Sequence, residues 1–241
     1  MRTRTLALAA ATGTALLATV ALPADAASGP APLQAQDQAQ AQAQAQEGTV
    51  SAAALLAKVT SCSQISNGRY RTDQGVSPTI PVCGKNGAVF WKADMDIDCD
   101  GQVTARCNRS TDPWFQADTA FHQSDGRPLN SEKLPYVVVP SPSATWNYAN
   151  AGIKGGSVVA VVHGDQVQYA VVGDTGPTKI IGEASYATAR ALGIDPDPAT
   201  GGTGSGVTYI LFTGSRVSPL ESHSAAVSLG DTLAKRFLQN N

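Results

Sequence analysis

Short apolar runs separated by turn residues dominate the second half of the chain. Because they are apolar at consecutive positions, these runs are typical of strands with both faces buried, as in a barrel or sandwich. A turn at 163–166, in which Gly164 can adopt positive φ, predicts that two of the strands form a hairpin. A glycine-rich loop at 201–206 precedes the last strand. The predicted strands are 136–139, 157–162, 169–172 and 207–212.

Helices are predicted at three places. Ser51 is a candidate N-cap for a short helix that runs through Lys58. A second helix is predicted over 184–192, because Gly193 favours the left-handed conformation that follows a helix. A third helix near the C-terminus has Ser224 as its candidate N-cap. Its apolar residues lie four positions apart and share one face: Ala225, Leu229, Leu233 and Phe237. The pattern as a whole predicts a mainly β fold with a few helices.

The first residues have the composition of a secretion signal. A positive start, an apolar run and a small-x-small site ending at Ala26 predict a signal peptide at 1–26. An N-terminal membrane anchor is the alternative, but Thr and Gly interrupt the apolar run. Residues 27–48 are rich in Gln and Ala and lack large apolar side chains, which predicts a disordered linker. Residues 49–241 then form a single domain, expected outside the cell and free of the membrane.

Cleavage after Ala26 would leave a mildly acidic chain. It removes two arginines and one aspartate, so Lys plus Arg falls from 17 to 15 and Asp plus Glu from 19 to 18, a net charge of −3. This charge gives no general attraction for nucleic acid or anionic lipid. Nothing in the pattern indicates an oligomer, so a monomer is expected.

The cysteine count is even, as in exported proteins with disulfides. Of the three possible pairings, Cys62–Cys83 with Cys99–Cys107 is favoured, because both bonds close short local loops. A zinc site is the alternative. It is disfavoured because there is no CxxC pair and the histidines are scattered.

Two carboxylates stand out at the ends of predicted elements. Asp174 follows a buried strand and is flanked by Gly173 and Gly176, which leave the backbone open to a ligand. Glu183 follows an apolar pair and a glycine at the predicted start of a helix. Two carboxylates on rigid elements can act as the acid and the base of glycoside hydrolysis. A turn aspartate and a helix-capping glutamate are the alternative.

A second acidic cluster lies between Trp91 and Gly101. If the segment is extended, its aspartates share one face: Asp94, Asp96, Asp98 and Asp100. A calcium loop is one explanation, although Cys107 occupies the position of the bidentate glutamate and excludes a standard EF-hand. A solvated edge strand is another. The third is a cleft that receives a polycation.

These motifs together resemble the chitosanases of glycoside hydrolase family 75. The resemblance covers about residues 60–215 and rests on Asp94–Gly101, Asp118–Phe121, Gly173–Pro177, Ile181–Ser185 and Gly206–Phe212, in that order. It implies an endo-acting hydrolase of β-1,4-linked glucosamine that inverts the anomeric carbon. The catalytic pair would be Asp174 and Glu183, to which we assign the roles of general base and general acid. No cofactor and no metal are expected.

Chitosan carries protonated amines, so the resemblance gives the acidic run a role. Asp94, Asp96, Asp98 and Asp118 are predicted to bind sugar cations. Trp91 or Tyr148 is a candidate for stacking on a sugar ring. The Gly-Asp-Thr-Gly turn after an apolar strand resembles a turn of the double-psi β-barrel fold, which we therefore predict. A β-sandwich is the fallback.

Two other functions fit parts of the pattern. A lytic transglycosylase or muramidase acting on peptidoglycan would use a single acid and would not need an acidic cleft. An expansin-like carbohydrate-binding protein would show exposed planar aromatics and no paired acids. Aromatic residues are only 6% of the chain, which argues against a broad stacking surface.

Overall fold

The computed structural model describes residues 47–241. The predicted signal peptide and all but the last residues of the predicted linker lie outside this range. The strands are β1 (Ser63–Gln64), β2 (Cys83–Lys85), β3 (Ala88–Asp98), β4 (Tyr136–Pro140), β5 (Val158–His163), β6 (Gln166–Gly176), β7 (Glu183–Ser185) and β8 (Thr203–Phe212). The helices are α2 (Ala52–Lys58), the 3₁₀ helix η1 (Tyr148–Ala151), α3 (Tyr186–Ala191) and α4 (His223–Asn240).

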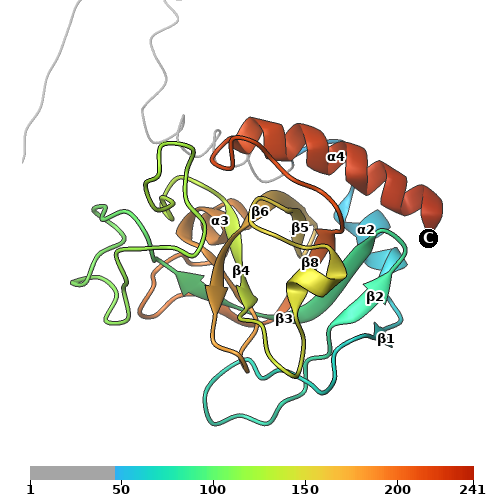
Figure 1. Ribbon diagram of the computed structural model, residues 1–241, viewed down its shortest axis with the longest axis horizontal. Helices are drawn as coiled ribbons and strands as arrows, with labels where there is room; N and C mark the ends of the chain where they lie inside the picture. Colours follow the sequence, from blue (N-terminus) through green and yellow to red (C-terminus); the bar gives the residue numbers. More distant parts are fainter. Residues whose placement is uncertain (1–46) are drawn as a thin grey trace, which may run out of the picture.

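A closed barrel forms the centre of the described residues (Figure 1). The strand order is β1-β2-β3-β7-β4-β6-β5-β8, and β8 pairs back onto β3, which closes the last six strands into a ring. The pairs β3–β7 and β4–β6 are parallel, whereas β5–β6 forms the predicted antiparallel hairpin. The predicted mainly β fold with a barrel-like core is therefore confirmed, and the fallback β-sandwich is not needed.

The residues on the two faces of the barrel wall belong to two different apolar clusters. Phe90, Tyr136 and Val171 belong to the cluster that includes residues of α2 and α4, so this face is the outer one. Their sequence neighbours, among them Val137 and Val172, belong to the second cluster and point inward. This division follows from the alternation of side chains along a strand. It explains why the strands are apolar on both faces.

Helix α4 crosses the outer face of β5 and β6 (Figure 1). Its buried residues are mostly small: Ala226, Gly230, Ala234 and Phe237. A Cβ at Gly230 would lie 2.4 Å from the ring of Tyr169, so glycine allows the close approach. The predicted stripe from Ala225 to Leu233 is only partly buried and flanks this contact. The N-cap is Ser222, not the predicted Ser224.

Local predictions were partly right. Ser51 caps α2 as predicted. The helix predicted over 184–192 begins only at Tyr186, with Ser185 as N-cap, because Glu183–Ser185 form strand β7 and pair with β3. Strand β8 starts at Thr203, inside the predicted glycine-rich loop.

Both favoured disulfides are confirmed. The Cα–Cα distances are 5.1 Å for Cys62–Cys83 and 5.0 Å for Cys99–Cys107. Among residues 47–241, no helix is both long and apolar enough to cross a bilayer. Glu47 lies against the barrel, where its carboxylate accepts hydrogen bonds from the side chain of Gln168 and the backbone of Tyr169.

Candidate active site

Four neighbouring strands place a row of residues side by side on the outer face of the barrel. Asp96 of β3 pairs with Glu183 of β7. The antiparallel register of β7 and β4 places Val138 beside Glu183, and Val138 pairs with Asp174 of β6. The two predicted catalytic residues therefore belong to one row and are separated by a single valine.

Asp174 reaches this face because β6 contains a bulge. The pairing with β4 skips Gly173, which adds one residue to β6. If β6 were regular and Gly173 paired normally, Asp174 would share the inward face with Val172. A side chain at position 173 has no room, since a Cβ there would lie 2.6 Å from atoms of both Leu129 and Tyr136.

The spacing of the pair follows from strand geometry. Two strand spacings of about 4.8 Å put the Cα atoms of Asp174 and Glu183 roughly 10 Å apart. The Glu183 side chain leans across β4, so that its Oε2 lies 2.6 Å from where a Cβ of Gly176 would be. Gly176 is two residues from Asp174, about 6.6 Å along the strand. The gap between the carboxyl groups is thus roughly 6–9 Å, with Val138 as its floor.

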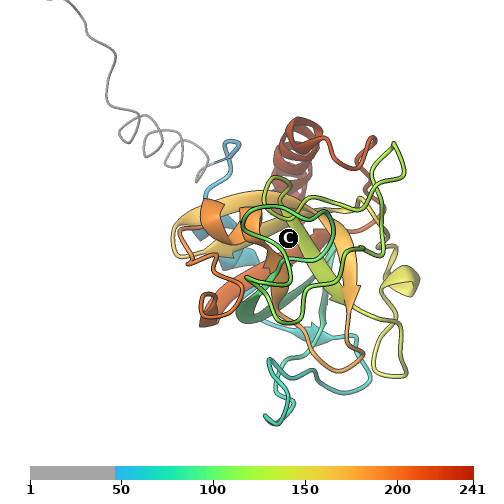
Figure 2. The same cartoon turned by 90° about the vertical axis from the view of Figure 1, so that its left-hand side faces the viewer.

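A cleft of about 420 Å³ opens over this row. The segment from Cys99 to Gln116 forms one wall, and the turn at Pro177 together with the loop 198–201 forms another. The first segment belongs to the long loops between β3 and β4, which lie in front of the barrel in Figure 2. The acidic residues that line the cleft are Asp96, Asp98, Asp100, Asp112, Asp174 and Glu183.

Asp174 is held by two backbone donors. Its Oδ1 accepts hydrogen bonds from the N–H groups of Ala120 and Thr175, each at 2.7 Å. Burial raises the pKa of Asp174 above its ordinary value, and these two hydrogen bonds oppose part of this rise because they favour the charged form. The two N–H groups therefore fix the orientation of the Asp174 carboxylate and favour its ionised form over its protonated form.

Glu183 experiences a different environment. Burial raises its pKa, and the charges of Asp96, Asp100 and Asp174 raise it further, to about 7. Within the described residues, no hydrogen-bond donor to its carboxylate was found. Glu183 is therefore the member of the pair that keeps a proton near neutral pH.

Three of the acidic residues form a close cluster. Oxygens of Asp98, Asp100 and Asp174 all lie within 4.8 Å of one another, close enough for one cation to bridge them. Burial and the charges of Asp174 and Asp100 raise the pKa of Asp98 well above its ordinary value. Burial raises the pKa of Asp100 to about 6. Such a set of hard oxygen donors suits a metal ion such as calcium or the ammonium group of a sugar.

Two of the predicted subsite aspartates lie elsewhere. Asp94 shares the face of Asp96, as alternation predicts, but it is only 3% exposed, because Gly182 passes directly over its carboxylate. It therefore does not line the cleft. Asp118 is exposed outside the cleft and pairs with His122 at 2.7 Å.

The aromatic predictions were wrong in position. Trp91 is fully buried inside the barrel and stacks on Tyr209, with ring centroids 5.5 Å apart, so no face is left for a sugar. Tyr148 lies in η1 and packs partly against the inner cluster, away from the cleft. The exposed aromatic of the cleft is Trp114, which the sequence analysis missed. The sequence signal for an exposed Trp114 was its place in an Asp-Pro-Trp segment of a polar loop.

Comparisons with known proteins agree with this geometry. A family model described as fungal chitosanase of glycosyl hydrolase group 75 matches residues 95–237, a segment that contains every acidic residue of the cleft. Endo-chitosanase C of Aspergillus oryzae is 28% identical over 204 residues, 79% of this chain and 51% of that protein. Endo-chitosanase B of Aspergillus oryzae is 32% identical over 161 residues, 60% of this chain and 67% of that protein.

The endo-chitosanase of Aspergillus fumigatus is similar to the same extent. It is 31% identical over 167 residues, which cover 64% of this chain and 69% of that protein. The chain spans about half the length of the endo-chitosanase C relatives that it matches.

Proposed function

The chain belongs to glycosyl hydrolase group 75, and we propose that it is an endo-chitosanase that hydrolyses β-1,4-linked glucosamine with inversion of the anomeric carbon. The observation that carries the proposal is the row in which Glu183 and Asp174 face one acidic cleft on either side of Val138. The proposal is also supported by the relatives, since those described above are named endo-chitosanases.

Glu183 acts as the general acid. Its raised pKa of about 7 keeps it protonated, so it can deliver a proton to the glycosidic oxygen as the bond to the anomeric carbon breaks. Asp174 acts as the general base, because its two N–H donors stabilise the ionised form. It removes a proton from the water that attacks the opposite face of the sugar.

The separation of the two carboxyl groups favours inversion over retention. An inverting pair is about 6.5–9.5 Å apart and leaves room for water, whereas a retaining pair is about 5–5.5 Å apart. The gap of roughly 6–9 Å derived from the strand spacing fits the inverting range better. Gly176 and Val138 keep this space free of larger side chains.

The acidic cleft supports a cationic substrate. Asp96, Asp98 and Asp100 line it without a lysine or arginine among the lining residues. Protonated amines of glucosamine units would relieve the repulsion among these carboxylates, whereas acetylated units would not. This charge pattern favours chitosan over the uncharged backbone of chitin, and over peptidoglycan.

We also propose that the protein acts outside the cell. The two disulfides fit an oxidising compartment, and the predicted signal peptide would direct export. After its removal, a monomer that does not associate with membranes is expected.

Hydrolysis of three polymers tests the function. The mature protein is incubated with highly deacetylated chitosan, chitin and peptidoglycan, and reducing ends are counted. Release from chitosan is expected, with the α-anomer appearing first by proton NMR. Glu183→Gln and Asp174→Asn should each lower kcat by about 10²–10⁴-fold.

Asp165→Asn is the matched control. It removes one charge in the β5–β6 turn, away from the cleft, and should leave the rate unchanged. Release from peptidoglycan but not from chitosan would favour a muramidase-like enzyme. Binding of polymer without cleavage would favour an expansin-like protein.

A further inference from the structure

Trp114 is exposed to an unusual degree for a tryptophan. Its relative exposure is 87%, whereas Trp91 and Trp146 are at 0% and 7%. A single exposed apolar residue needs no explanation by itself. Trp114, however, lines the acidic cleft, so its indole is presented where a substrate would lie.

The loop around Trp114 is held rigidly from both sides. Its own N–H donates to Oδ1 of Asp112 at 2.8 Å. Two residues later, the N–H of Gln116 donates to Oδ1 of Asp100 at 2.7 Å. Between them Phe115 turns inward and is only 5% exposed. The indole therefore projects from a defined backbone and not from a loose tip.

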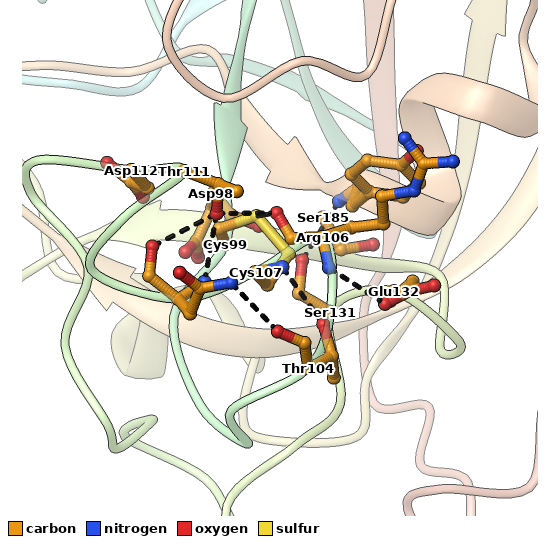
Figure 3. The surroundings of a disulfide bond; sticks show 12 residues. Asp98, Cys99, Thr104, Arg106, Cys107, Thr111, Asp112, Ser131, Glu132 and Ser185 are labelled. Carbon is orange, nitrogen blue, oxygen red and sulfur yellow. Dashed lines mark hydrogen bonds between the residues drawn. A yellow bond between two sulfur atoms is a disulfide. The ribbon is translucent and has the colours of Figure 1, made fainter.

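A disulfide anchors the same loop to the end of β3. Phe115 packs in a small apolar cluster with Cys99, Cys107 and Tyr186. Figure 3 shows the Cys99–Cys107 bond with Asp98 and Asp112 among its surroundings. The strand that carries Asp96 and Asp98 is thus covalently linked to the wall that presents Trp114.

Trp114 is also close to the proposed catalytic pair. Asp100, which holds the backbone of Gln116, has a carboxylate oxygen within 4.8 Å of Asp174. A chain bound over Asp174 would therefore place a neighbouring sugar of the same polymer against the wall at Trp114.

We propose that Trp114 is the stacking platform of a subsite next to the catalytic pair and that it selects glucosamine units. This inference rests on the proposed function. The indole face packs on the C–H face of a sugar ring. It also attracts the ammonium group through a cation–π interaction, which an acetylated unit lacks. Asp112 and Asp100 position the loop that carries the indole.

Binding and turnover test the platform separately. Trp114→Ala should raise KM for a fully deacetylated glucosamine hexamer about tenfold and leave kcat within about threefold, because the indole contacts a neighbouring sugar and not the bond that breaks. Trp114→Phe should keep much of the affinity. Val103→Ala is the control, since Val103 is an exposed apolar residue (69%) on the same loop but does not line the cleft.

Acrylamide quenching supplies a readout that does not depend on turnover. Trp114 is the exposed tryptophan, so it accounts for most of the quenching in the Glu183→Gln protein. The glucosamine hexamer should protect the fluorescence, the acetylated hexamer should protect it less, and Trp114→Phe should abolish the effect.

The two possible failures are distinguishable. No reducing ends from chitosan with the wild-type protein would end the proposed function. An active wild type whose KM is unchanged by Trp114→Ala, or whose fluorescence the hexamer does not protect, would overturn the platform alone.

Discussion

Asp96 should set the alkaline limit of activity through its charge on Glu183. The two residues are register partners on adjacent parallel strands. After burial, the charge of Asp96 is the largest cause of the raised pKa of Glu183. Replacing Asp96 by Asn removes the charge and keeps the shape. The pKa of Glu183 should then fall, and the general acid should lose its proton at lower pH.

The size of this shift follows from Coulomb's law. Side chains on adjacent strands place the two carboxylates about 6 Å apart. Asp96 is exposed, so an effective dielectric constant between about 20 and 80 applies, which gives roughly 0.7–2.8 kcal/mol. At 1.36 kcal/mol per pKa unit, the pKa of Glu183 should drop by about 0.5–2 units.

The assay is the pH profile of kcat/KM on a soluble glucosamine oligomer. In the wild type, the rate should decline above about pH 7, where Glu183 loses its proton. In Asp96→Asn, the alkaline limb should move by about one unit towards acid, while the acid limb, set by Asp174, moves little. Titration of the substrate is the same for every variant and cancels in the difference. The reasoning fails if the alkaline limb stays in place, or if Asp165→Asn moves it equally.

Two further predictions concern space and stability. Gly176→Ala places a Cβ 2.6 Å from Oε2 of Glu183 and 3.1 Å from Val138. We expect kcat to fall about 10²-fold, while the circular dichroism spectrum stays that of the wild type. Unchanged kinetics would show that the gap tolerates a methyl group. Burial raises the pKa values of Asp94 and Glu183 to about 7 and those of Asp96 and Asp100 to about 6. The folded protein therefore binds more protons than the unfolded chain between about pH 4 and pH 7. Stability should fall as pH rises through this window, with Tm several degrees lower at about pH 8 than at about pH 5; a Tm that rises over this range would contradict the raised pKa values.

Four of the six barrel strands were predicted from the sequence, because a wall buried on both faces leaves consecutive apolar residues. Strand β3 was considered only as a possible extended segment, since its second half alternates between aspartate and apolar residues. Short elements were harder to predict. Residues 183–185 carry no apolar run, and they become a strand only because β3 and β4, distant in sequence, pair with them on either side. Local propensity favours a helix there and contains no information about pairing with distant strands.

Within the site, alternation along β3 correctly put Asp94 and Asp96 on one face. It could not show that Gly182 would cover Asp94, since that contact depends on the path of the chain into β7. Trp91 and Trp114 illustrate the same limit. Both were available aromatic residues near acidic motifs, and only their positions inside the barrel and on the loop distinguish a core residue from a cleft residue.

The position of the proposed catalytic aspartate, Asp174, depends on a single extra residue in β6. Ala170 and Val172 point into the barrel, so strict alternation would carry Asp174 inward as well, where an ionised carboxylate would have no partner. The bulge at Gly173 transfers Asp174 to the outer face, beside Val138 and within reach of the N–H groups of Ala120 and Thr175. The glycine in the Gly-Asp-Thr-Gly motif is therefore needed for the direction of the aspartate, because regular pairing of residue 173 would remove the proposed general base from the cleft without changing a single acidic residue.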